Sequence, residues 1–86
     1  MPYIKKNERD RYSVILMALR ETEILNGGHL NYLFCKLALI YLNQRGASYQ
    51  TWSDIHSAFS LGDAELRRRF LDSYEDVKRS ENGDLI

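Results

Sequence analysis

The side chains best suited to bind an anion form a run of three arginines, Arg67, Arg68 and Arg69. A guanidinium group is a flat fork of donors, so one or two of these arginines in a groove would bind a phosphate through paired hydrogen bonds. A structural explanation competes with this one, because acidic residues four positions away stabilise a helix by about 0.2–0.5 kcal/mol per pair. The pairs are Asp63–Arg67, Glu65–Arg69 and Arg68–Asp72.

Other polar side chains would complete an anion site. Lys36 lies in an apolar stretch, where an unpaired ammonium is costly. It therefore either extends to the surface or meets a carboxylate or a ligand anion. Asn31 and Tyr32 either bond to loops or line the same site, and Tyr49 or Tyr74 could stack on a base. The candidate ligand-binding residues are Arg68, Arg69, Lys36, Asn31, Tyr32, Tyr49 and Tyr74.

The residue types of a catalytic or metal centre do not occur together. His29 and His56 are the only histidines, and no His, Cys or Asp cluster has the spacing of metal ligands. The chain has no glycine-rich phosphate loop, serine elbow or Cys-His pair. Glu75 and Asp76 are adjacent, so on a helix they diverge by about 100° and cannot act as an acid–base pair. We therefore expect no catalysis, no metal and no cofactor.

Composition bounds the class of protein. The chain has 86 residues, typical of one domain, and its 12 basic and 12 acidic side chains give no net charge. This balance disfavours general nucleic-acid binding, which requires excess positive charge. The single cysteine, Cys35, is expected to be buried and inert. The chain shows no signal peptide at its start, and its longest apolar run is too short for a membrane span. We therefore expect a cytoplasmic protein.

The elements that would position these residues are helices. Apolar spacing and capping signals predict an all-α fold, a small antiparallel bundle with helices at about 8–25, 29–44 and 51–78. Residues 1–6 form an extended arm and residues 80–86 a polar tail. Asn7 would cap the first helix.

Glycine and threonine mark the expected helix boundaries. Asn26-Gly27-Gly28 would end the first helix and Gly46 the second, because glycine accepts the left-handed conformation of a helix C-cap. Thr51-x-x-Asp54 would begin the third. We expect this third helix to be continuous but bent near Gly62 or Asp72, and the alternative is a break at Gly62.

The second helix predicts self-association. It is apolar on nearly every side, so it should be buried on nearly every side. Three helices of one short chain cover only part of it, and the remaining apolar patch, with Trp52 or tyrosines, is too large for a monomer. We therefore expect a homo-oligomer, most simply a two-fold dimer. The alternative is that the other helices wrap it completely.

Several short motifs resemble a family of small uncharacterised proteins of phages, prophages and bacteria. They are Met1-Pro2-Tyr3-Ile4, Leu30-Asn31-Tyr32, Tyr41, Ser48-Tyr49, Arg68-Arg69, Tyr74-Glu75-Asp76-x-Lys78 and Asn82-Gly83-Asp84. The resemblance spans nearly the whole chain. Family members carry Gly-Asp where this chain has Gly28-His29, and often proline where it has Ser73, which favours a bend near Asp72. The resemblance implies no catalytic residue and suggests a phage-type accessory protein.

Two functions follow as expectations. The first is a non-catalytic oligomeric protein that sequesters a small anionic ligand, such as a nucleotide signal of host immunity, as an anti-defence sponge. The alternative is a protein–protein inhibitor or adaptor of a host defence complex, which would use the region of Trp52 or the acidic Glu75-Asp76 end. The expected partners are further copies of the chain and one of these two targets.

Overall fold

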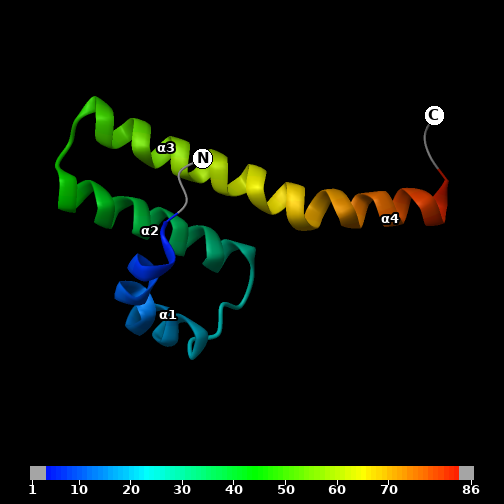
Figure 1. The fold of residues 1–86 in the computed structure, drawn as a ribbon, viewed down its shortest axis with the longest axis horizontal. Coiled ribbons are helices and arrows are strands. Elements are labelled where there is room, and N and C mark those ends of the chain that lie inside the picture. The colour runs from blue at the N-terminus through cyan, green and yellow to red at the C-terminus, as the bar shows by residue number, and fades with distance from the viewer. Residues whose placement is uncertain (1–3, 84–86) are drawn as a thin grey trace. The chain divides into compact units, whose positions relative to one another are not determined.

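The computed structural model describes residues 4–83, and their regular structure is entirely helical, which confirms the all-α prediction (Figure 1). The elements are a 3₁₀ segment η1 and helices α1 and α2, followed by α3, a π turn η2 and α4. Their bounds are Lys6–Tyr12, Ser13–Arg20, Gly27–Arg45, Tyr49–Leu66, Arg67–Leu71 and Asp72–Asn82. The chain divides into two compact units, Met1–Ile40 and Tyr41–Ile86. The antiparallel packing of the helices stays a prediction.

The first helical stretch is shorter and less regular than expected. It starts as the 3₁₀ segment η1 at Lys6 without a side-chain cap, and Asn7 lies inside it. It ends at Arg20 rather than near residue 25. The Thr22 hydroxyl donates to the carbonyl of Ala18 at 2.8 Å, and the Thr22 N–H donates to Leu19 at 3.2 Å. These bonds tighten the last turn and satisfy carbonyls that a longer helix would use. The first three residues of the expected arm lie outside the described residues.

Asn26 starts α2 instead of ending the helix before it. Its side-chain oxygen accepts from the N–H of His29 at 3.1 Å, and its carbonyl accepts from Leu30 at 3.1 Å. Asn26 is thus an N-cap, the role that asparagine fills well because its oxygen satisfies a free amide of the first turn. Gly27 and Gly28 are helical and neither has a positive φ. The predicted glycine stop at this point was wrong, because the asparagine cap outcompetes it.

The apolar helix α2 is not enclosed. No residue of α2 is buried, and Cys35, predicted to be buried, is exposed. A chain of this length has too little apolar surface to enclose a helix that is apolar on all sides. Each unit therefore shows large apolar side chains to the solvent, such as Val14 at 79% and Phe70 at 66% exposure.

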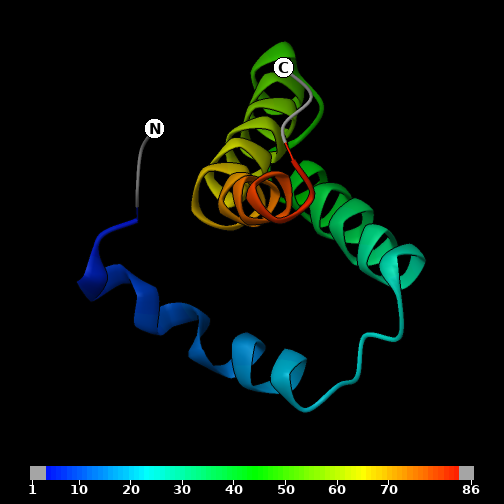
Figure 2. The ribbon, with the colours of Figure 1, turned by 90° about the vertical axis from the view of Figure 1, so that its right-hand side faces the viewer.

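Residues Tyr49–Asn82 form one uninterrupted helical rod within the second unit (Figure 1). Gly62 lies inside α3, so the alternative of a break at this residue was wrong. The irregularity is the π turn η2, which ends directly before Asp72. Figure 2 views α4 nearly end-on, with α3 running away behind it, so the rod is bent.

The rod continues through Asn82, and its C-cap is Gly83 at φ 89°. The predicted polar tail therefore starts too early, and residues 84–86 of that tail lie outside the described residues. Polar composition did not mark the end of the helix, because charged residues near this end pair with one another along it. Lys78 pairs with Glu81, and Arg79 pairs with Asp76. None of the helices in the described part of the chain has both the length and the apolar character needed to cross a bilayer.

Candidate functional site

The corner between α2 and α3 holds a network of hydrogen bonds in the second unit. Gly46 adopts φ 82° and its N–H donates to the carbonyl of Leu42 at 2.8 Å. A left-handed residue after the last turn is the usual glycine end of a helix, so the predicted stop at Gly46 is confirmed. Ser48 then begins α3, since its side chain accepts from the N–H of Thr51 at 3.1 Å.

Thr51 is the buried, hydrogen-bonded polar residue of this corner. It is 4% exposed, and its hydroxyl donates to the carbonyl of Gly46 at 2.8 Å. The same hydroxyl lies 3.0 Å from the Ser48 hydroxyl. Because Thr51 has one hydroxyl hydrogen, which it gives to Gly46, Ser48 must donate in that second bond. The prediction that Thr51 itself begins the helix was wrong, because Ser48, three residues earlier, takes the cap.

Asp54 links the two helices at this corner. Its Oδ2 accepts from the Tyr41 hydroxyl at 2.8 Å, and its Oδ1 accepts from the Gln50 amide at 2.7 Å. The hydrogen bond to Asp54 is the main cause that raises the pKa of Tyr41, because it favours the neutral phenol. The sequence predicts a capping role for Asp54, with Thr51, and no polar role for Tyr41. The polar pair was missed, although a tyrosine among leucines and an aspartate one turn into the next helix were the available signal.

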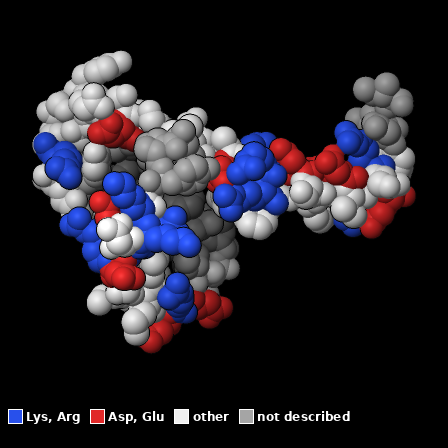
Figure 3. Space-filling model, viewed as in Figure 1, with Lys and Arg blue, Asp and Glu red and all other residues white. Residues whose placement is uncertain are grey.

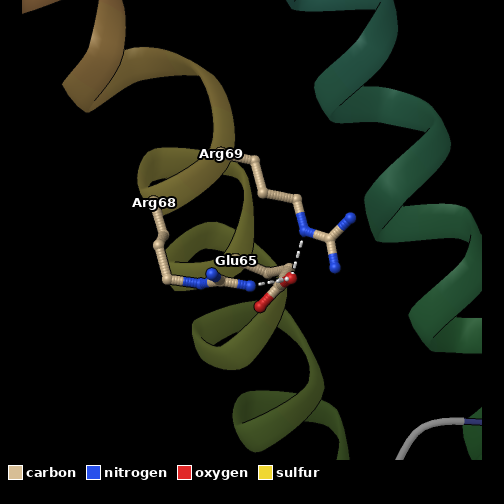
Figure 4. A network of polar contacts seen from close by, with 3 residues as sticks. All are labelled: Glu65, Arg68 and Arg69. Carbon is tan, nitrogen blue, oxygen red and sulfur yellow. Dashed lines mark hydrogen bonds and ion pairs between the residues drawn. The ribbon is translucent and has the colours of Figure 1, made fainter.

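The arginine run binds neighbouring carboxylates. Arg68 and Arg69 both reach Glu65, Arg68 at 2.8 Å, and Arg69 through its Nε (Figure 4). Arg67 pairs with Asp63 at 3.1 Å. Two of the three predicted acid–base pairs thus form. The third, Arg68–Asp72, is replaced by Arg68–Glu65, because the wider π turn separates residues four apart across it.

The electrostatics of this run are mixed. Figure 3 shows basic side chains on the rod with acidic ones directly beside them. The Arg68 and Arg69 side chains are 66% and 55% exposed, whereas Glu65 is 19% exposed. Two guanidinium groups therefore share one half-buried carboxylate, and each arginine side chain is more than half exposed. This arrangement leaves one net positive charge among these three side chains.

The remaining candidate residues fall into two groups. In the first unit, Lys36 stacks its ammonium 5.4 Å from the centre of the Tyr32 ring, and Asn31 is exposed. Lys36 therefore extends to the surface over an aromatic face, a contact worth about 0.5–1 kcal/mol.

In the second unit, Tyr49 is 88% exposed at the start of α3. Nineteen residues separate it from Arg68, roughly 28 Å along a helix, so one copy does not bring them together. Tyr74 is also exposed, and Lys78 lies 5.7 Å from its ring centre.

A hollow at the start of α2 was not expected from the sequence. It has a volume of about 430 Å³ and is bordered by the turn before α2 and the first turns of that helix. Its lining is Thr22, Glu23, Ile24, Gly28, His29, Tyr32 and Leu33. Tyr32 is the one candidate ligand residue that lines it. The hollow lies just after the early end of α1 at Arg20, which the sequence pattern did not indicate.

Comparison with known proteins gives a family and no activity. Among the residues that the structure describes, no group of three or more His, Cys, Asp or Glu side chains is placed to hold a metal ion. No curated protein and no solved structure matches the chain. A family model described as a domain of unknown function, DUF6899, matches residues 1–85. The chain therefore belongs to the DUF6899 family, which confirms the expectation of an uncharacterised family.

Proposed function

We propose that this protein is a non-catalytic binding protein that acts as an assembly of identical copies. One observation carries this proposal. Of the described apolar side chains only Ile55 is buried, at 8% exposure. Folding must offset roughly 1–2 kcal/mol of backbone entropy per residue, and one buried isoleucine cannot do so. Apolar faces of a second copy would supply the missing burial, and two-fold association is the commonest form.

The ligand that fits best is a small anion of the nucleotide class. Arg68 and Arg69 both contact the carboxylate of Glu65, so these three side chains together carry an excess of positive charge. A guanidinium fork binds phosphate in a bidentate manner. Exposed tyrosines, of which Tyr49 is the most accessible, supply rings for a base to stack on. Because one copy does not bring these groups together, we propose that the ligand site forms between copies.

The biological setting is part of the same proposal. The motifs resemble those of phage-encoded proteins, and phages gain from removing the nucleotide signals that activate bacterial immunity. We therefore propose an anti-defence sponge that sequesters such a signal in the host cytoplasm without cleaving it.

Thermal-shift measurements on the full chain test the ligand proposal. The panel is a set of cyclic and linear nucleotides, and the variants are R68A/R69A and, as a matched control on the same rod, R79A. We expect at least one nucleotide to raise the melting temperature of the wild type and of R79A but not of R68A/R69A. No stabilisation by any nucleotide would overturn the nucleotide proposal.

A second candidate is a protein inhibitor or adaptor of a host defence complex. Trp52 favours it, because this indole is 47% exposed on α3 and tryptophan is enriched in the energetic centres of protein interfaces. The acidic Glu75-Asp76 segment is a further expected contact surface. A stoichiometric host protein that binds wild type but not W52A would support this candidate over the sponge.

A further inference from the structure

The rod carries an apolar stripe that crosses the π turn. Leu66, Phe70 and Tyr74 are 57%, 66% and 57% exposed. They border one shallow hollow of about 440 Å³, together with Asp63, Arg67 and Leu71. These residues therefore share one face of the rod, which no other described residue buries.

The π turn is what keeps this stripe in line. Residues four apart on a regular α-helix differ by about 40° in direction, so Leu66 and Tyr74 would diverge by about 80°. The turn η2, Arg67–Leu71, lies between them. A π turn accommodates one extra residue, which offsets this rotation. Past Tyr74 the stripe resumes with Val77, three residues later, as in a coiled-coil seam.

We propose that this stripe is a seam between two antiparallel copies of the chain, related by a two-fold axis at Phe70. The inference rests on the self-association proposed above and assigns it a surface. Such an axis brings the same flank of both rods together. Leu66 of one copy then packs on Tyr74 of the other, and Leu71 lies next to its own equivalent.

The charges on that flank select this partner and this direction. Asp63 lies seven residues before Phe70 and Lys78 eight residues after it, both about 10–12 Å along a helix. The antiparallel seam thus places Asp63 of each copy opposite Lys78 of the other. A parallel seam would place Asp63 of each copy level with Asp63 of the other and far from Lys78, so it would lose this complementarity.

The charged neighbours within one copy fit this arrangement. Asp63 already pairs with Arg67 at 3.1 Å and Lys78 with Glu81 at 3.4 Å, in exposed positions. A lysine opposite Asp63 extends the first pair into a network rather than breaking it. The Lys78 ammonium stands over the Tyr74 ring, so it lies beside the stripe where the second copy would meet it.

Cross-linking of single-cysteine variants tests the seam in the full-length protein. All variants carry Cys35→Ser, because Cys35 is exposed and would react. Phe70→Cys places a thiol at the proposed axis. Asp72→Cys is the matched control, since it lies about 200° around a regular helix from Phe70. A short bis-maleimide links thiols that lie close together.

The expected result is a covalent dimer for Phe70→Cys and none for Asp72→Cys. Neither Asp63→Cys nor Lys78→Cys should form a covalent dimer alone. A mixture of the two variants should form one, because the antiparallel seam places position 63 of one copy opposite position 78 of the other. Phe70→Glu should raise the dimer Kd roughly a hundredfold or more, because it buries an unpaired carboxylate.

Three outcomes overturn the inference. A link in Asp63→Cys alone would contradict the antiparallel register. No link in Phe70→Cys, with wild type still larger than a monomer in light scattering, would refute the seam and leave self-association standing. A wild type that stays monomeric at high concentration would refute the seam and the proposed assembly together.

Discussion

The hydroxyl pair at the α2–α3 corner makes a quantitative prediction. Thr51→Val keeps the buried volume but removes the donor to Gly46 and the acceptor for Ser48. Loss of a partner to a hydrogen-bonded group costs about 1–3 kcal/mol. Gly46 and Ser48 are both exposed, so water can replace part of the loss. We therefore expect Thr51→Val to lower the free energy of unfolding by about 1–2 kcal/mol.

A double-mutant cycle isolates the bond between the two hydroxyls. Ser48→Ala removes the cap that accepts from the N–H of Thr51, and loss of a serine cap costs about 1 kcal/mol. Both single variants also break the bond between the hydroxyls, so the double variant loses it only once. We expect the double variant to be more stable than the sum of the singles implies, by about 0.5–1 kcal/mol.

Urea unfolding followed by far-ultraviolet circular dichroism measures all four proteins. Protomer concentration is held fixed, because association shifts apparent stability. Thr51→Ser is the control: it keeps the hydroxyl and loses one methyl group, worth about 0.8 kcal/mol. Additive single effects would refute the hydroxyl pair, and a neutral Thr51→Val would refute the corner itself.

Four single substitutions give the further predictions. The hydrogen bond to Asp54 raises the pKa of Tyr41 above its value in the unfolded chain. The bond therefore stabilises the fold fully at pH values below the ordinary tyrosine pKa. This stabilisation is lost as the pH rises through the raised pKa of the folded protein. Unfolding of wild type and Tyr41→Phe across alkaline pH should show a difference that vanishes at high pH; a constant difference would contradict it. Gly46→Ala should destabilise the fold by about 1–2 kcal/mol, because φ is positive at this residue. Gly62→Ala should stabilise the fold by about 1 kcal/mol in the same urea assay. Gly62 lies inside α3, and nothing lies within 4 Å of the added Cβ. Asn26→Ala should cost about 0.5–2 kcal/mol in thermal or urea unfolding through loss of the α2 cap, and an unchanged midpoint would show that the cap does not matter.

Sequence periodicity predicted the helical class and the continuous rod, because Phe59, Leu66 and Phe70 keep a helical spacing across Gly62. It did not predict the boundaries at Asn26 and Ser48. Both residues cap helices through their side chains. Gly27 and Gly28 next to Asn26 predicted a helix end instead, and Thr51, three residues after Ser48, predicted a later helix start.

The candidate site was harder to predict than the fold. The arginine pairs with Asp63 and Glu65 follow from spacing along one helix. The contact between Tyr41 and Asp54 depends on how the turn at Gly46 folds back, and no periodic pattern encodes that. The predicted burial of Cys35 was wrong. Apolar neighbours in the sequence indicate that a residue favours burial, but they do not show that one chain has enough other apolar residues to bury it.

The π turn makes the C-terminal part of the rod tolerant of the loss of one residue. Removing one residue from Arg67–Leu71 would let the segment relax to ordinary helix, with no loss of helical content. The side chains from Asp72 onward would keep nearly their present direction, because the π turn already takes up one extra residue without the 100° rotation that a residue adds to a regular helix. A family member that lacks that residue would therefore keep both the helices and the apolar face that Leu66 and Tyr74 share.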